Sequence, residues 1–414
     1  MIKKRVSVEL KKGINLIIVR PLWDYPITRG ALVLHTGAYK DPEGKKGLSS
    51  VFSDLLNERS KLLEKMELYG AKIKSSASLT RSFVSFAFLN SNLKKSFALL
   101  SEFVADFTPD SGLLNVVKGK RIDKLSILED DPEYIISRKL QEVVYKKSVL
   151  SNPVSGLKED IENISLKDVE SYYNHEFLES PIDIVIVSSV SWSRIRSMVE
   201  NVVEKFTPKD IKIPSPPVGY TAEKILMRKK KLGNVFVTYF IPAWGVGTEE
   251  YLPLKLVSYV LGEGSFNSRL MRKLREDLAL AYYVTSGVSR GFTIHGKRYT
   301  GYFEVAAEAR MEAKERLIEE LEKSIKSIVN YGITREEFEL AKSYYIGMER
   351  KRGETYKDIL DTILAERIYN LKENYFLGIR DEIKKVTMND VKKVLLNLGE
   401  KDFSRIILEE EKSE

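Results

Sequence analysis

The sequence predicts an α+β fold of two homologous domains, each a mostly antiparallel β-sheet packed with helices. Its 414 residues exceed what one ordinary hydrophobic core accommodates. The segment Ile213–Gly219 has three prolines in four positions, which excludes both a helix and a central strand. The order of apolar patterns before this break recurs after it. We therefore expect domains at 1–212 and 222–414, joined by a linker at 213–221.

The first domain begins with two runs of alternating apolar residues, which predict strands. A helical stretch, a third strand, more helices and a last strand follow. The predicted strands are Ile14–Val19, Ala31–His35, Phe83–Leu89 and Ile182–Val187.

The second domain repeats this order. Its predicted strands are Val235–Phe240, Tyr302–Ala307 and Ser404–Leu408, and Thr334–Glu337 has the spacing of a capping box that starts a helix. Near the end of each half, Ile164–Val169 and Val386–Val391 both read apolar, hydroxyl, apolar, polar, Asp, Val. A duplicated unit explains this repetition.

The charge of the chain points to a solvated surface of mixed sign. There are 67 Lys and Arg and 59 Asp and Glu, for a formal net charge of +8. The densest basic run, Arg228–Lys231, is predicted to be the exposed start of a strand, with attraction for acidic peptides as the alternative. No nucleic-acid-binding signature accompanies it.

The chain contains no cysteine, which excludes disulfides, thiolate metal sites and a cysteine nucleophile. Its basic N-terminus continues into alternating residues instead of the apolar core of a signal peptide. No stretch approaches the roughly 18 apolar residues of a membrane helix. We expect a cytoplasmic protein that binds neither membrane nor nucleic acid.

Several short motifs carry a resemblance to a known family. They include Gly37, Asp41, Gly47-Leu48, Leu68–Ile73 and Glu129–Pro132. This pattern resembles the pitrilysin and insulinase zinc peptidases, whose smaller members include mitochondrial processing peptidase, and the likeness spans nearly the whole chain. In that family the helix after Gly-Leu carries the inverted motif His-x-x-Glu-His, whose histidines bind zinc while its glutamate activates water.

The resemblance implies that the zinc site is degenerate in this chain. Ser50, Ser53 and Asp54 stand at the motif positions, and the third ligand position falls on Lys124, with Asp123 as the one-register alternative. A serine hydroxyl does not replace imidazole as a zinc ligand, and an ammonium repels a dication. The remaining histidines, His35, His175 and His295, lie far apart in the sequence and are expected to be structural or at the surface. We expect no metal in this chain and zinc in a partner.

Two residues of the second half match the family's substrate-holding signature. In Leu261–Leu270 and Leu274–Tyr282, the resemblance assigns Arg275 and Tyr282 to the bound peptide beside the scissile bond. A guanidinium can hold a peptide carbonyl, and a phenol can donate to an oxyanion. Alternatively, Arg275 pairs with Glu276 or Asp277, and Tyr282 and Tyr283 lie in a strand core.

The family also binds extended peptides along an edge strand of the first domain. The resemblance places that edge at Lys74–Thr80, with Ser75, Ser76 and Ala77 as candidate contacts. The same residues could equally form an exposed hairpin edge.

The leading functional hypothesis is a non-catalytic, substrate-binding subunit of a heteromeric zinc metallopeptidase that cleaves peptides or unfolded polypeptides. Its partner would carry His-x-x-Glu-His. One alternative is a stand-alone zinc endopeptidase with an unrecognised metal site. Another is a peptide-binding or scaffold protein without catalytic role, and a homodimer of isolated copies stays open.

Overall fold

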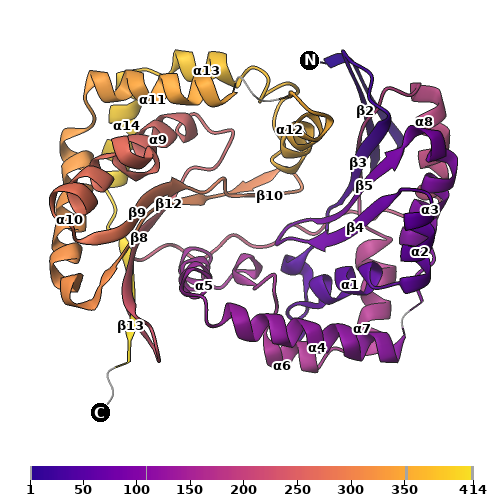
Figure 1. Cartoon of the computed structure of the whole chain (residues 1–414), viewed down its shortest axis with the longest axis horizontal. Coiled ribbons are helices and arrows are strands. Elements are labelled where there is room, and N and C mark those ends of the chain that lie inside the picture. Colours follow the sequence, from indigo (N-terminus) through magenta and orange to yellow (C-terminus); the bar gives the residue numbers. More distant parts are fainter. Residues whose placement is uncertain (1, 109, 350–352, 412–414) are drawn as a thin grey trace.

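The computed structural model describes residues 2–108, 110–349 and 353–411. It contains two large sheets, each packed against helices, together with a small two-stranded hairpin (Figure 1). The predicted α+β fold of two sheet-and-helix halves is confirmed.

The first half contains a six-stranded sheet in the order β1-β2-β6-β3-β5-β4. Its strands are β1 (Ile2–Lys11), β2 (Ile14–Pro21), β3 (Ile27–Leu34), β4 (Lys72–Ala77), β5 (Ser82–Leu89) and β6 (Ile182–Val187). Its helices are α1 (Leu48–Asn57), α2 (Ser60–Leu68), α3 (Leu93–Ala105), α4 (Ser111–Leu128), α5 (Pro132–Val144), α6 (Lys158–Glu162), α7 (Leu166–Ser171) and α8 (Trp192–Val202).

The second half contains a five-stranded sheet in the order β7-β13-β8-β12-β9. Its strands are β7 (Lys224–Lys229), β8 (Asn234–Ala243), β9 (Ala281–Val288), β12 (Gly301–Arg310) and β13 (Ser404–Glu410), and the hairpin is β10 (Phe292–Ile294) and β11 (Lys297–Tyr299). Its helical elements include α9 (Tyr251–Ser258), the π-helical η7 (Met271–Asp277), α10 (Lys314–Tyr331), α11 (Arg335–Met348), α12 (Tyr356–Ile368), α13 (Ile379–Lys385) and α14 (Met388–Gly399).

The two sheets have the same topology once β1 is set aside. The order β2-β6-β3-β5-β4 corresponds strand by strand to β7-β13-β8-β12-β9. In each sheet the first pair is parallel and the other pairs are antiparallel. The repeated motif forms a capping box in each half, at Ser165 and at Thr387, and the capping box predicted at Thr334 also forms. The predicted duplication is therefore present in the fold.

The prediction that Arg228–Lys231 starts a strand is wrong. Arg228 and Lys229 end β7, and the next two residues form a turn. Arg228 pairs with Glu409 and Lys229 with Asp130. Because β7 only alternates between exposed and half-buried residues, its apolar pattern is weak and the basic run was the stronger signal.

Each half packs one helix against the sheet of the other half, and the two helices are equivalent in the duplicated fold. Helix α5 of the first half packs on the second sheet, where Leu140 joins an apolar cluster with Phe240 and Leu408. Helix α12 of the second half packs on the first sheet, where Ile363 joins a cluster with Val19 and Val187. Both helices lie between the two sheets (Figure 1). Apolar contact therefore fixes the halves relative to each other at two places.

A buried ionic cluster strengthens the contact made by α12. The Asp183 carboxylate, 2% exposed, accepts from Arg367 of α12 at 2.6 Å and from Asn15 at 3.0 Å. His35 Nε2 lies 3.0 Å from the same carboxylate. Burial alone would raise the pKa of Asp183, but its bond to His35 and the charges of His35 and Arg367 outweigh burial and lower it. The aspartate is therefore ionised across the interface.

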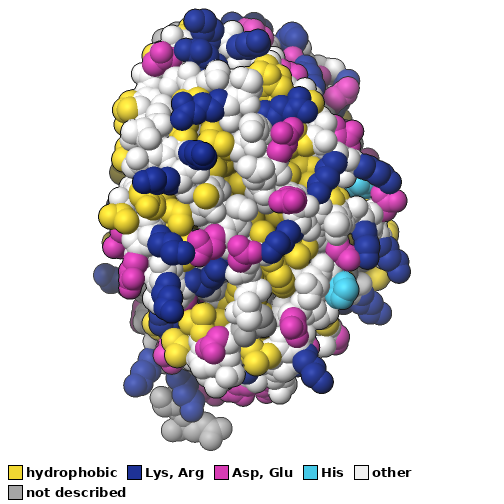
Figure 2. All heavy atoms as spheres, turned by 90° about the vertical axis from the view of Figure 1, so that its right-hand side faces the viewer, with side chains coloured by type: hydrophobic (Ala, Val, Ile, Leu, Met, Phe, Trp, Pro, Cys, Tyr) yellow, Lys and Arg dark blue, Asp and Glu magenta, His cyan; other side chains and the backbone are white. Residues whose placement is uncertain are grey.

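The outer face of the first half carries charged side chains of both signs, interspersed with hydrophobic and uncharged ones, as expected from the composition (Figure 2). Across the part of the chain that the structure describes, no helix combines the length and the apolar character needed to cross a membrane.

Candidate functional site

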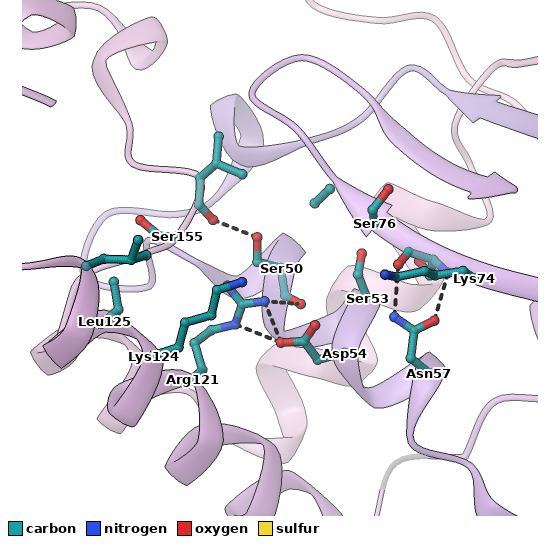
Figure 3. Close-up of a pocket in the computed structure, with 14 residues that line it drawn as sticks. Ser50, Ser53, Asp54, Asn57, Lys74, Ser76, Arg121, Lys124, Leu125 and Ser155 are labelled. Atoms are coloured by element: carbon teal, nitrogen blue, oxygen red, sulfur yellow. Dashed lines mark hydrogen bonds and ion pairs between the residues drawn. The ribbon is translucent and has the colours of Figure 1, made fainter. Parts of the chain in front are cut away.

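The degenerate motif positions lie around one pocket of about 340 Å³. Helix α1 forms one wall, strand β4 a second and helix α4 a third, and Val154 and Ser155 complete the lining. The lining includes every predicted position of the degenerate zinc site and of the edge strand: Ser50, Ser53, Asp54, Ser75, Ser76, Ala77 and Lys124 (Figure 3). Asp123 is not part of the lining.

The start of α1 is held by the buried carboxyl group of Asp41. It accepts hydrogen bonds from the backbone N–H of Gly47 at 2.8 Å and of Ser49 at 2.9 Å, and from the Ser49 hydroxyl at 3.2 Å. Burial raises the pKa of Asp41 to about 7, against the opposing effect of these hydrogen bonds. Gly47 has φ +101° and lies so close to Gly156 that a Cβ would approach its Cα within 2.7 Å. These contacts fix where Ser50, Ser53 and Asp54 project.

An arginine that the sequence did not single out fills the centre of the degenerate site. Arg121 of α4 donates from Nε to Asp54 Oδ2 at 2.9 Å, and its Nη2 also contacts this oxygen. The same Nη2 donates to the Ser50 carbonyl at 3.3 Å. The Arg121 side chain is 12% exposed, so a largely buried guanidinium neutralises the one acidic side chain that lines the pocket.

The two serines are engaged with the backbone. The Ser50 hydroxyl donates to the Val154 carbonyl at 2.6 Å, and the Ser53 hydroxyl donates to the Ser49 carbonyl at 3.1 Å. Both side chains are buried. Their hydroxyl protons therefore stabilise local structure, as is usual for serine within a helix.

These donors do not fit a zinc ion. Zinc takes imidazole, thiolate or carboxylate ligands, whereas here two hydroxyls and a paired carboxylate face Arg121 and Lys124. Nowhere in residues 2–108, 110–349 and 353–411 do three or more His, Cys, Asp or Glu gather closely enough to hold a metal ion.

The histidines stand apart from this pocket. His35 is bonded to Asp183, His175 lies 3.6 Å from Glu179, and His295 occupies the turn between β10 and β11. Burial lowers the pKa of His35, partly offset by its bond to Asp183.

Strand β4 is the edge of the first sheet, and its outer side is partly covered. The Asn57 carboxamide accepts from the Ser75 backbone N–H at 2.8 Å and donates to the Ser75 carbonyl at 2.9 Å. The amide thus imitates one residue of a neighbouring strand. A peptide that added to this edge would have to displace Asn57 at Ser75 or pair elsewhere along the strand.

The structure does not bring Arg275 and Tyr282 into this pocket. Arg275 lies in η7 and Tyr282 in β9, the strand that corresponds to β4 in the second half. Tyr282 is 76% exposed, so it is not strand core. The Arg275 guanidinium lies 5.7 Å from the Phe266 ring centroid. Among the described residues, Arg275 forms no ion pair with Glu276 or Asp277. Both side chains are exposed to solvent.

Fold and site together are those of a peptidase-like protein, with an arginine–aspartate pair at the place to which the resemblance assigns the zinc donors. Comparisons with known proteins agree. Residues 163–345 match the family model described as the peptidase M16 inactive domain. The resemblance read from the sequence is confirmed, since the chain is similar to M16 peptidase homologues in this region and over most of its length.

Among its relatives is the "Non-peptidase homolog YmxG" of Helicobacter pylori, 23% identical over 372 residues, which cover 87% of this chain and 83% of that protein. The "Uncharacterized zinc protease YmxG" of Bacillus subtilis is 22% identical, with 75% of this chain and 74% of that protein covered. The crystal structure of a peptidase M16 inactive domain from Pseudomonas fluorescens superimposes with a TM-score of 0.88 at 19% identity, over 99% of each chain.

Proposed function

We propose that this chain is the non-catalytic, substrate-binding subunit of a two-component zinc peptidase. The observation that carries the proposal is the Arg121–Asp54 pair, which places a guanidinium where the catalytic site of such an enzyme needs metal donors. This pocket lacks the ligands for a zinc ion that would polarise a water molecule there.

The exposed pair Arg275 and Tyr282 supports a role in holding a polypeptide for a partner. Neither side chain packs in the core, and Arg275 takes part in none of the ion pairs among the described residues. An arginine can hold a peptide carbonyl and a phenol can stabilise an oxyanion that forms on a zinc site of another chain. We further propose that the partner carries His-x-x-Glu-His.

The test is to copurify the chain from native extract, identify a zinc-peptidase partner by mass spectrometry, and assay the reconstituted pair on an unfolded polypeptide. Arg275→Ala and Tyr282→Phe should each lower kcat/KM at least about tenfold, equivalent to about 1.4 kcal/mol of transition-state stabilisation. Arg272→Ala and Tyr283→Phe are matched controls, because these exposed residues are neighbours on the same elements. They should retain activity.

Two results would contradict the proposal. One is unchanged activity in both variants of the reconstituted pair. The other is stoichiometric zinc in the purified chain, measured by elemental analysis, together with peptide hydrolysis in the absence of a partner. That second result would favour a stand-alone zinc endopeptidase, while peptide binding without any recoverable partner would favour a scaffold.

A further inference from the structure

The pocket between α1, β4 and α4 has the charge pattern of an anion site. Its charged lining residues are Lys74, Arg121 and Lys124 against Asp54 alone. Since Arg121 already neutralises Asp54, the pocket retains the charges of two ammonium groups. The corresponding site of the zinc peptidases binds a metal cation. The residues at that place in this chain favour an anion instead.

The two lysines are not neutralised by the protein. Lys74 extends from β4 toward Ser53, and Lys124 extends from α4 toward α1 (Figure 3). None of the ion pairs among the described residues involves either ammonium. By contrast, Lys120, one turn earlier on α4, pairs with Glu58 at 2.8 Å. Unneutralised ammonium groups that converge on one cavity attract an anionic group.

The pocket lies beside the edge strand β4, so a peptide bound along that edge would bring its carboxylates to the pocket. Strand β4 is the sheet edge, and a peptide that adds to it would send alternate side chains over the pocket. Asn57 blocks the outer backbone groups of Ser75, so a peptide paired further along β4 would either turn there or end there. A side-chain carboxylate would reach the lysines in the first case and a C-terminal carboxylate in the second.

We propose that the degenerate metal pocket recognises a carboxylate of a bound peptide through Lys74 and Lys124. This inference rests on the proposed peptide-binding function and specifies its substrate class as acidic or C-terminal segments.

The experiment is fluorescence anisotropy of the full chain with labelled Val- and Thr-rich short peptides in three versions. One has a central Glu and an amidated C-terminus, the second has Gln in place of Glu, and the third is the Gln peptide with a free C-terminal carboxylate. The Glu or the free-carboxylate peptide should bind at least about tenfold more tightly than the neutral peptide. Added salt should reduce this preference.

Lys74→Gln and Lys124→Gln should each reduce the preference severalfold without weakening binding of the neutral peptide. Lys120→Gln is the control on the same helix, since its ammonium is engaged by Glu58, and it should leave the preference unchanged. Circular dichroism checks that the variants are folded. The version that binds more tightly distinguishes an internal carboxylate from a C-terminal one.

Equal affinity for all three peptides would overturn the carboxylate assignment while leaving peptide binding intact. A preference that survives both lysine substitutions would also overturn it. If none of the peptides binds, the carboxylate pocket and the substrate-binding function both fail.

Discussion

The side chain of Glu304, on β12, is a carboxyl group without a described hydrogen-bond or ion-pair partner of its own. Burial raises the pKa of Glu304 from 4.5 to about 7. The folded state therefore binds this proton more tightly than the unfolded state. The resulting stabilisation is fully present below pH 4.5 and is lost as the pH rises through 7.

We expect Glu304→Gln to remove the contribution of Glu304 to the pH dependence of stability. The free energy of unfolding, from urea titrations between these two pH values, should fall as pH rises in the wild type and fall less steeply in the variant, where Asp41, with its pKa also raised to about 7 by burial, still contributes. Glu308→Gln is the control on the same strand, because the Glu308 carboxylate accepts from Asn234 at 2.7 Å. A wild type whose stability does not fall across this window would refute the assignment.

Residue by residue, the sequence predicted the loss of zinc donors but not what replaced them. Counting back from Asp131-Pro132 located Lys124, which does line the pocket. Arg121 lies one turn earlier on the same face of α4, and it is Arg121 that reaches Asp54. Which of two cations on one helix face contacts α1 depends on the rotation of α4 in the tertiary structure, and residue spacing does not specify that rotation.

At the scale of elements, strand β4 is held by a side chain of the neighbouring helix. Asn57, the last residue of α1, bonds both outer backbone groups of Ser75. An exposed edge strand otherwise presents free N–H and C=O groups to other chains. Asn57 therefore limits which part of this edge another strand can use.

Asn57→Ala should expose the Ser75 amide. Hydrogen exchange of the segment 72–77 should accelerate, and the free energy of unfolding should fall by about 1 kcal/mol. Asn57→Asp should protect the amide better than alanine does, because a carboxylate still accepts from the N–H. Asn92→Ala removes a comparable bond, to the Tyr69 carbonyl at 3.0 Å, away from the edge. If exchange at 72–77 accelerates equally in both alanine variants, Asn57 has no special role at the edge.

The strands themselves were predictable because alternation is a local pattern. Ile182–Val187 forms β6 with the predicted bounds, and Phe83–Leu89 lies within β5. The pairing of Asn57 with Ser75 depends on how α1 lies against β4, and no local pattern in the sequence indicates it. The packing of α5 and α12 on the sheet of the opposite half was not predictable either, because an apolar helix face does not reveal which sheet it covers.

At the scale of the whole molecule, the contact between the halves includes the Asp183 cluster. Arg367→Ala would leave a carboxylate that is 2% exposed without its cationic partner from α12. We expect a loss of about 3 kcal/mol in the free energy of unfolding, because a buried carboxylate that loses its guanidinium partner is costly even while its bonds to His35 and Asn15 remain.

Thermal and urea denaturation measure this loss. Arg380→Ala, at an exposed position on α13, should change stability by less than about 0.5 kcal/mol. Equal stability of the Arg367 variant and the wild type would mean that water replaces the guanidinium at Asp183.

The reciprocal placement of α5 and α12 also bears on how the molecule could open. If the proline-rich linker alone joined the halves, they could rotate about it as about a single hinge. Because each half instead packs its equivalent helix on the sheet of the other half, any separation of the halves would have to shift both apolar contacts together. Substitutions in either apolar contact should therefore change how readily the halves separate, without altering the residues that line the pocket of the first half.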